Sequence, residues 1–156
     1  MTNQPSPAEL LYAGIQLTRP LLRNITARVE ADLSGTGISV GQRAVMEVLL
    51  NVEQATAPEI TEMLQVKRQL VARLLQEMLA RQMVETLPNP RHRRSHFYRL
   101  TTASRKQISE IRAREMTDIA DFAQKFSDDE IRAFHRIQSA LNQAFAPYAD
   151  RESPEI

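Results

Sequence analysis

The chain has 156 residues, 42% of them apolar, with no cysteine and no tryptophan, so it is long enough for one folded unit with an aliphatic core and excludes disulfides and thiolate metal sites. Its formal net charge is only +1, but residues 57–106 contain 10 basic and 4 acidic side chains, and the rest of the chain contains 10 basic and 15 acidic ones. The basic segment favours a polyanionic partner, and the alternative is chance clustering of charge on a solvated surface.

Two helices are predicted in the first third of the chain. Apolar residues keep a helical spacing over Pro7–Leu33, with Ser6 as the predicted cap. Pro20 lies inside this helix and is expected to kink or divide it, because proline removes a backbone donor and clashes with the preceding turn. The glycine-containing segment 34–37 ends the helix, and a second helix is predicted over Ser39–Asn51, with its serine as the cap.

A helix-turn-helix pattern follows. Thr56–Glu59 has the sequence of a capping box and opens a short helix that ends near Leu64. Residues 65–66 form a tight turn, and a second helix is predicted over Lys67–Gln82. Two helices joined by so short a turn are typical of a helix-turn-helix. The predicted buried face of the second helix consists of Leu70, Val71, Leu74, Leu75 and Met78.

A β-hairpin is predicted next, with strands over 83–87 and 95–101 and a loop that contains three arginines. A long helix is predicted from Thr102, and Ser127 is predicted to cap a last helix, with a polar tail after Tyr148.

These elements predict a mainly α-helical fold, in which a winged helix-turn-helix lobe with a two-stranded β-wing is flanked by N- and C-terminal helices. The expected domains are an N-terminal dimerisation helix (1–38), a winged helix-turn-helix DNA-binding domain (39–101), and C-terminal dimerisation helices with a tail (102–156).

Two groups of side chains indicate binding to double-stranded DNA. First-turn residues of a recognition helix read base edges, where Arg suits guanine and Gln suits adenine. Amphipathic geometry projects five residues away from the apolar face of the second motif helix: Lys67, Arg68, Gln69, Ala72 and Arg73. An ordinary solvated helix face is the alternative. The hairpin loop favours DNA binding over this alternative, because concentrated positive charge suits a narrow minor groove. Its arginines are Arg91, Arg93 and Arg94.

The first and last helices each carry an apolar stripe. A chain of this length offers only a limited core to bury both stripes within one subunit. Packing against a second copy would bury them and place two recognition helices about one DNA turn apart, which matches a palindromic site. Packing within one chain is the alternative. The predicted interface residues are Leu10, Leu11, Ile15, Ile131, Phe134, Ile137, Leu141 and Phe145.

Neither an enzyme nor a metalloprotein is indicated. His92 and His96 fall on a loop and a strand, and His135 is distant in sequence, so no metal-ligand spacing is formed. The chain has no Gly-rich phosphate loop and no nucleophile motif, and no cofactor is expected. It also lacks a signal-peptide pattern and an apolar run of about 20 residues, so a cytoplasmic protein without membrane association is expected.

Residues 40–104 together resemble the winged-helix transcription regulators of the multiple-antibiotic-resistance-regulator (MarR) family. Thr56–Leu64 resembles the first helix of the family motif, and Val66–Leu74 occupies the place of the recognition helix. Asn89–Arg94, followed by Leu100-Thr101, resembles the wing, in which an Asp-x-Arg tip precedes a Leu-Thr pair. Three positions depart from this pattern. His92 stands where the family has the wing aspartate, and Gln82 and Ser104 stand where the family usually has glycine.

The resemblance implies a homodimer that binds a palindromic operator and represses transcription until a small, often phenolic or anionic, effector binds. Thr56, at the start of the first motif helix, is also expected to contact DNA. Candidate polar groups for the effector are Tyr12, Arg19, Arg23 and Arg43, with simple surface positions on the first two helices as the alternative.

Two other functions remain open from the sequence. One is a winged-helix module that uses its basic lobe to bind an acidic protein partner. The other is a small-molecule binding protein without DNA binding, because His92 replaces the carboxylate that would orient Arg94.

Overall fold

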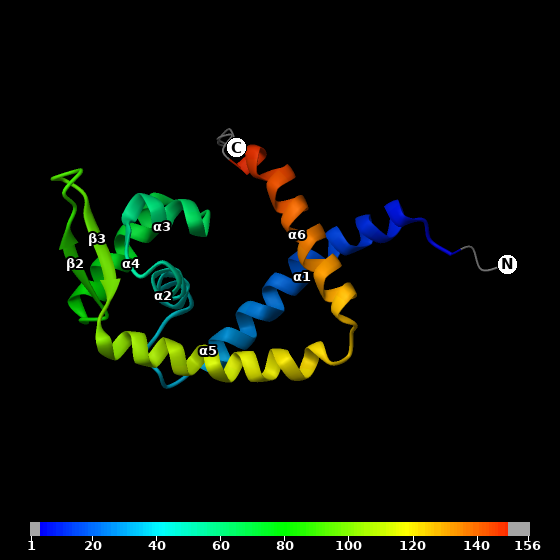
Figure 1. Cartoon of the computed structure of the whole chain (residues 1–156), viewed down its shortest axis with the longest axis horizontal. Helices are drawn as coiled ribbons and strands as arrows, with labels where there is room; N and C mark the ends of the chain where they lie inside the picture. Colours follow the sequence, from blue (N-terminus) through cyan, green and yellow to red (C-terminus); the bar gives the residue numbers. More distant parts are fainter. Residues whose placement is uncertain (1–3, 150–156) are drawn as a thin grey trace. The chain divides into compact units, whose positions relative to one another are not determined.

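The computed structural model describes residues 4–149, and side chains as far as residue 146, so the predicted polar tail falls outside the described side chains. The described chain is mainly helical with one small antiparallel sheet, which confirms the predicted fold class (Figure 1). It divides after Ser109 into two compact units, 1–109 and 110–156, which are described separately here.

The observed elements agree with the predicted ones to within about two residues at most ends. The helices are α1 (Pro7–Leu33), α2 (Val40–Val52), α3 (Ala57–Leu64), α4 (Arg68–Ala80), α5 (Thr102–Ala123) and α6 (Asp128–Ala149). The strands are β1 (Ala55–Thr56), β2 (Val84–Pro88) and β3 (His96–Leu100).

Side-chain caps explain where most of these helices begin. The side chains of Ser6, Ser39, Thr56 and Ser127 each accept from the backbone N–H three residues later, and that third residue bonds back to the cap. These reciprocal bonds satisfy backbone donors that a helix start otherwise leaves open. The four predicted caps are therefore confirmed.

Pro20 does not divide α1, which continues as one helix to Leu33. Pro20 is exposed, so water can reach the carbonyl that loses its intrahelical donor at this position.

The hairpin of β2 and β3 belongs to a three-stranded sheet of order β1-β3-β2, so the prediction of a two-stranded wing was incomplete. Strand β1 pairs antiparallel with β3, with Ala55 opposite Tyr98 and Thr56 opposite Phe97. The register of β2 with β3 runs from Val84 opposite Leu100 to Pro88 opposite His96.

The core of the first unit lies between α2, α3, α4 and the sheet. Of the five residues predicted for the buried face of α4, Val71, Leu74, Leu75 and Met78 are buried and Leu70 is half-buried. The same core includes Leu33, Ile38, Val45, Met46, Leu49, Ala55, Ile60, Met83, Val84, Leu100 and Ile108.

The second unit contains the rest of α5 and all of α6. Phe122 and Phe126 pack with ring centroids 5.6 Å apart, and the Lys125 ammonium lies 4.7 Å from the Phe122 ring. Within the described part of the chain, no helix is both long and apolar enough to cross a membrane.

Candidate nucleic-acid interface

Thr56 sets the start of α3. Its backbone N–H donates to the Glu59 carboxylate at 2.7 Å, and its hydroxyl accepts from the Glu59 N–H at 3.4 Å. Donation from the Thr56 backbone, and then from its hydroxyl, lowers the pKa of Glu59 below its usual 4.5. Thr56 is buried, so the structure gives it a role in starting the helix. Its expected contact with DNA stays a prediction.

The turn between α3 and α4 is tight because Gln65 adopts a left-handed conformation with φ 52°. Its N–H donates to the Glu62 carbonyl at 3.2 Å, which closes the end of α3. Two residues later Lys67 occupies the N-cap position of α4, which begins at Arg68. The predicted helix-turn-helix is therefore present, with α4 as its second helix.

The start of α4 differs from the starts of α1, α2, α3 and α6, because Lys67 at its cap position makes no side-chain hydrogen bond to the helix. Lysine has no acceptor, so the first backbone N–H groups of α4 remain available to an external anion. All five predicted groove residues of this helix are exposed: Lys67, Arg68, Gln69, Ala72 and Arg73.

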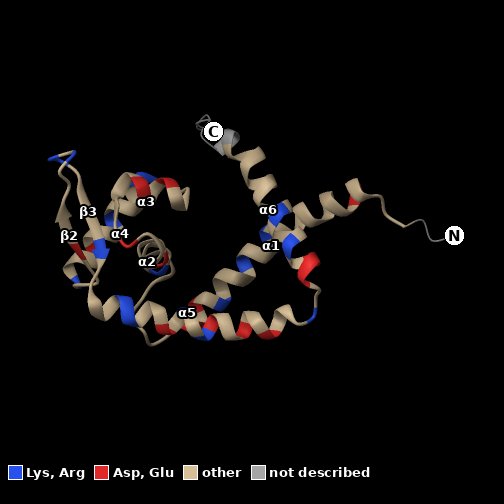
Figure 2. Ribbon diagram, viewed as in Figure 1, with Lys and Arg blue, Asp and Glu red and all other residues tan. Residues whose placement is uncertain are grey.

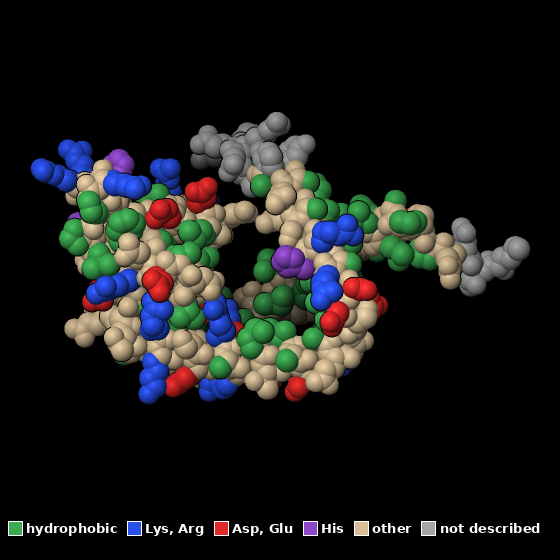
Figure 3. All heavy atoms as spheres, viewed as in Figure 1, with side chains coloured by type: hydrophobic (Ala, Val, Ile, Leu, Met, Phe, Trp, Pro, Cys, Tyr) green, Lys and Arg blue, Asp and Glu red, His purple; other side chains and the backbone are tan. Residues whose placement is uncertain are grey.

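The wing loop is built from two consecutive turns. The Asn89 side chain accepts from the Arg91 N–H at 3.0 Å, and the Asn89 carbonyl accepts from the His92 N–H at 3.2 Å. The His92 carbonyl in turn accepts from the Ser95 N–H at 3.0 Å. These bonds fold the segment back on itself, so that basic residues gather at the tip of the hairpin (Figure 2), where their side chains lie at the surface (Figure 3). The exposed residues of the tip are Arg91, His92, Arg93 and Arg94.

Most of the predicted DNA-contacting cations lack an acidic partner. Among residues 4–146, none forms an ion pair with Lys67, Arg68, Arg91, Arg93 or Arg94. Arg73 is the exception, since its Nε lies 4.0 Å from the Glu77 carboxylate. Arg99 on β3 contrasts with the tip, because its Nε binds the Glu85 carboxylate at 2.6 Å.

The two positions where the resemblance implies a glycine are occupied in different ways. Gln82 takes the left-handed conformation that glycine would favour, with φ 55°. Ser104 lies in the first turn of α5, where it is buried and its hydroxyl accepts from the Thr101 hydroxyl at 3.1 Å. The replacements are therefore accommodated, the first with backbone strain and the second with a hydrogen bond.

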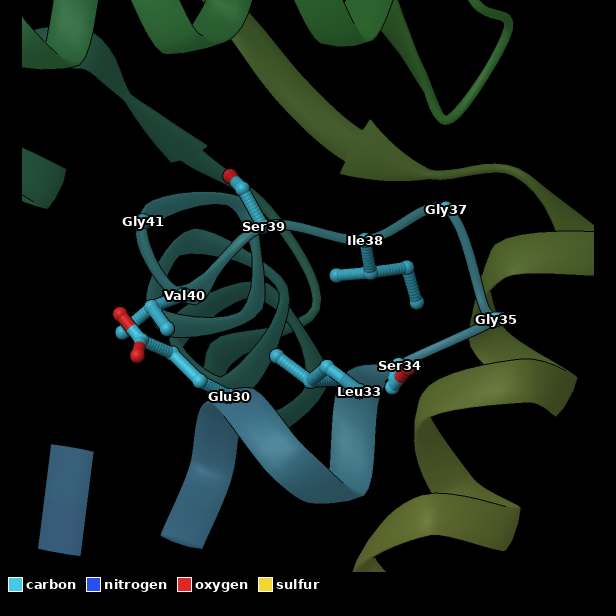
Figure 4. Close-up of a pocket in the computed structure, with 9 residues that line it drawn as sticks. All are labelled: Glu30, Leu33, Ser34, Gly35, Gly37, Ile38, Ser39, Val40 and Gly41. Carbon is cyan, nitrogen blue, oxygen red and sulfur yellow. The ribbon is translucent and has the colours of Figure 1, made fainter. Parts of the chain in front are cut away.

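The predicted effector residues are dispersed. Tyr12, Arg19 and Arg23 are exposed on α1, whereas Arg43 is partly buried on α2 with its guanidinium 3.8 Å from Glu47. A pocket is present at the corner between α1 and α2 (Figure 4), and none of these four residues lines it.

The predicted interface residues are mostly exposed in the single chain. On α1, Leu10 and Leu11 are exposed and Ile15 is half-buried. On α6, Ile131, Phe134, Ile137 and Phe145 are exposed and Leu141 is half-buried.

Sequence reasoning missed a polar contact between α2 and the end of α4. Arg81 donates to the side-chain oxygen of Gln42 at 3.2 Å, and Gln42 is only 4% exposed. These residues lie 39 positions apart, and no local pattern signals their pairing.

No three His, Asp or Glu side chains within the described part of the chain are grouped so that they could hold a metal ion.

Comparisons with known proteins agree with this geometry. A sequence profile described as the MarR family matches residues 36–95. The crystal structure of a MarR family transcription regulator is 45% identical, with a TM-score of 0.79, over 92% of this chain and 95% of that one. No curated protein matches the chain significantly.

More distant solved structures share the fold. A MarR family protein from Bacillus stearothermophilus has a TM-score of 0.71 at 20% identity, over 91% of this chain and 99% of that one. Streptococcus pneumoniae FabT, solved in complex with DNA, has a TM-score of 0.74 at 18% identity, over 88% and 99% respectively.

Proposed function

Because the chain belongs to the MarR family of transcription regulators, we propose that it is a homodimeric repressor that binds a palindromic DNA operator and releases it when an effector binds. The observation that carries this proposal is the set of exposed cations at the start of α4 and the tip of the wing that pair with no acidic side chain among residues 4–146. Positive charge concentrated without compensation disfavours the free protein and favours a polyanion.

The first turn of α4 is proposed to enter the major groove. Arg68 and Gln69 are exposed there and have the fork geometry that pairs with guanine and adenine edges. Lys67 stands at the uncapped helix start, where a phosphate can meet both its ammonium and the backbone N–H groups. Ala72 and Arg73, one turn later, are proposed to lie along the same groove.

The wing tip is proposed to reach the minor groove or its phosphates. Arg91, Arg93 and Arg94 are all exposed, and the two turns that hold them are closed by backbone and Asn89 hydrogen bonds. The tip is thus shaped by the loop itself and carries its arginines outward. Guanidinium groups suit this place because the potential of a narrow minor groove is strongly negative.

Dimerisation is proposed to use α1 together with the helices of the second unit. Large apolar side chains that are more than half exposed, such as Leu10 at 59% and Phe134 at 59%, occur on both. Exposed apolar surface of this extent is uncommon on a soluble monomer and marks an interaction surface. A symmetric pair of subunits would also present two α4 helices to a palindromic site.

The test is DNA binding by fluorescence anisotropy over a salt series, with Arg94→Ala compared with Arg99→Ala. Each phosphate contact contributes about 0.9 to the slope of log affinity against log salt, so loss of Arg94 from both subunits should lower the slope by about 1.8. Arg99 is the matched control, because it lies on the same hairpin but is held by Glu85. Its replacement should change the slope by less than half as much.

Equal slopes for wild type and Arg94→Ala would contradict the role of the wing. No binding of the wild type even at low salt would contradict DNA binding as a whole and favour an acidic protein as the partner of the basic lobe. Light scattering on the same samples gives the mass of the protein in solution, which decides whether it is a dimer.

A further inference from the structure

The wing tip holds one titratable group among its arginines. His92 is exposed and stands between Arg91 and the pair Arg93 and Arg94. Residues 86–109 contain no aspartate or glutamate, and Figure 2 accordingly shows basic residues and no acidic ones at the tip. Among residues 4–146, no side chain forms a hydrogen bond or an ion pair with the imidazole of His92. The ring is therefore open to an external partner.

The backbone of His92 is fixed by both turns of the loop. Its N–H donates to the Asn89 carbonyl at 3.2 Å, and its carbonyl accepts from the Ser95 N–H at 3.0 Å. His92 thus closes the first turn and opens the second. Because its backbone groups are committed to these bonds, the loop sets the place of the ring, and only the side-chain torsions remain to be chosen. A partner can meet the ring without refolding of the wing.

The other two histidines of the chain lie outside the tip. His96 is the first residue of β3, opposite Pro88 of β2, and it is exposed. His135 is on α6, in the second unit. His96 is therefore a matched control for His92, because it is an exposed histidine of the same hairpin that does not lie among the arginines.

The chemistry of an imidazole at this place differs from that of the arginines. Histidine ordinarily gains its proton between about pH 5 and pH 8, whereas arginine stays charged throughout. The protonated ring donates from both nitrogens and carries a positive charge, and the neutral ring keeps a single N–H donor. A phosphate close to the ring favours the protonated form. If the wing arginines lie against the minor groove, the phosphates that border the groove come within reach of His92.

We propose that His92 is a further DNA-contacting residue of the wing, and that it contacts a phosphate in its protonated form, so that DNA binding takes up a proton at each wing. This inference rests on the proposed function, because it requires the wing to meet DNA. It adds a dependence on pH. Since the bound protein holds more protons than the free protein, DNA affinity rises as the pH falls.

The first test measures the binding of a random-sequence duplex by fluorescence anisotropy over a salt series, at about pH 5.5 and at about pH 8. Each phosphate contact contributes about 0.9 to the slope of log affinity against log salt, so the slope should be steeper by about 1.8 for a dimer at the lower pH. At about 0.1 M salt the affinity should rise by about tenfold or more. The cap of α3 should persist in this range, because the pKa of Glu59 lies below its usual 4.5.

Two substitutions of His92 separate its charge from its place in the loop. His92→Asn cannot gain a proton and should bind at both pH values as the wild type does at the higher one. His92→Arg carries the charge at both and should bind as the wild type does at the lower one. His96→Asn should keep the pH dependence of the wild type. If His92 only shaped the loop, the Asn and Arg variants would have the same salt slope.

Calorimetry in two buffers with different enthalpies of ionisation measures the protons taken up on binding. The wild type should take up to about one proton per subunit within the histidine range. The uptake should be largely lost in His92→Asn and kept in His96→Asn.

The possible failures are distinguishable. Equal wild-type affinity at the two pH values, or a full pH dependence in His92→Asn, would overturn the inference and leave the proposed function standing. A pH dependence lost in His96→Asn instead would assign the proton to the start of β3 and would also overturn it. Absence of DNA binding at low salt at both pH values would overturn the proposed function and this inference together.

Discussion

Replacement of Lys67 by serine should make the protein more stable and a weaker DNA binder at the same time. Lys67 holds the cap position of α4 and makes no hydrogen bond to the helix. A serine there can accept from a backbone N–H of the first turn, as Ser39 does in α2 at 3.1 Å. A good cap stabilises a protein by about 1 kcal/mol, which corresponds to an increase of about 3 °C in Tm for a chain of this size.

The same substitution removes one positive charge from each subunit at the proposed phosphate contact. The slope of log affinity against log salt should therefore fall by about 1.8 for a dimer. Lys67→Ala is the matched control, since it removes the charge without supplying an acceptor. It should show the same loss in the salt slope but no gain in stability.

Urea unfolding at fixed protein concentration gives the stability, and anisotropy over a salt series gives the slope. Fixed concentration matters because the apparent stability of a dimer depends on it. If Lys67→Ser and Lys67→Ala were equally stable, the start of α4 would already be satisfied in the free protein. If both kept the wild-type slope, Lys67 would not meet a phosphate.

Three further predictions concern other parts of the chain. Gln82→Gly should stabilise the protein by about 0.5 kcal/mol in urea unfolding, because relief of a left-handed non-glycine residue outweighs the added freedom of the unfolded chain; a loss of stability would refute strain at this position. Thr56→Val should cost about 1 kcal/mol by removing the side-chain cap of α3. Because the pKa of Glu59 is lowered in the folded state, its contribution is present above pH 4.5 and is lost as the pH falls through the lowered value. The Thr56 backbone N–H, the larger cause of the lowered pKa, is kept in this variant and only the hydroxyl is lost, so unfolding should depend slightly less on acid; an unchanged acid profile would show that the hydroxyl does not contribute. Phe134→Asp should yield monomers in light scattering and weaken operator binding, since an exposed apolar ring of α6 is replaced by a charge; a dimer that persists would remove Phe134 from the interface.

Most local features could be predicted from the sequence because they depend on residues close together in the chain. The caps at Ser6, Thr56 and Ser127 need only a hydroxyl and a glutamate three residues apart. The buried face of α4 follows from the 3.6-residue period, and the loop arginines are visible as a run.

The features that could not be predicted depend on pairing between distant residues. Strand β1 has only two residues, and it is defined by its register with Phe97 and Tyr98, more than 40 positions later. A segment so short carries no alternation that a sequence pattern could reveal. The contact of Arg81 with Gln42 is of the same kind, and so is the pocket formed by the α1–α2 corner. Only the folded chain brings these groups together.

The way the helices begin separates residues that stabilise the fold from residues available to a partner. Starts with a Ser or Thr cap use their backbone donors internally, and the carboxylates that complete these caps at Glu9, Glu59 and Glu130 have lowered pKa values because the same residues donate to them. A phosphate approaching the start of α1, α3 or α6 would meet a carboxylate already bound there. The start of α4 has no carboxylate in its first turn, and it has Lys67 and Arg68 in place of a cap. An anion at this start would gain both the helix dipole and two cations without displacing any group of the protein. The stability that a cap would add is therefore absent at the helix start that is proposed to bind DNA, and Lys67→Ser measures that exchange directly.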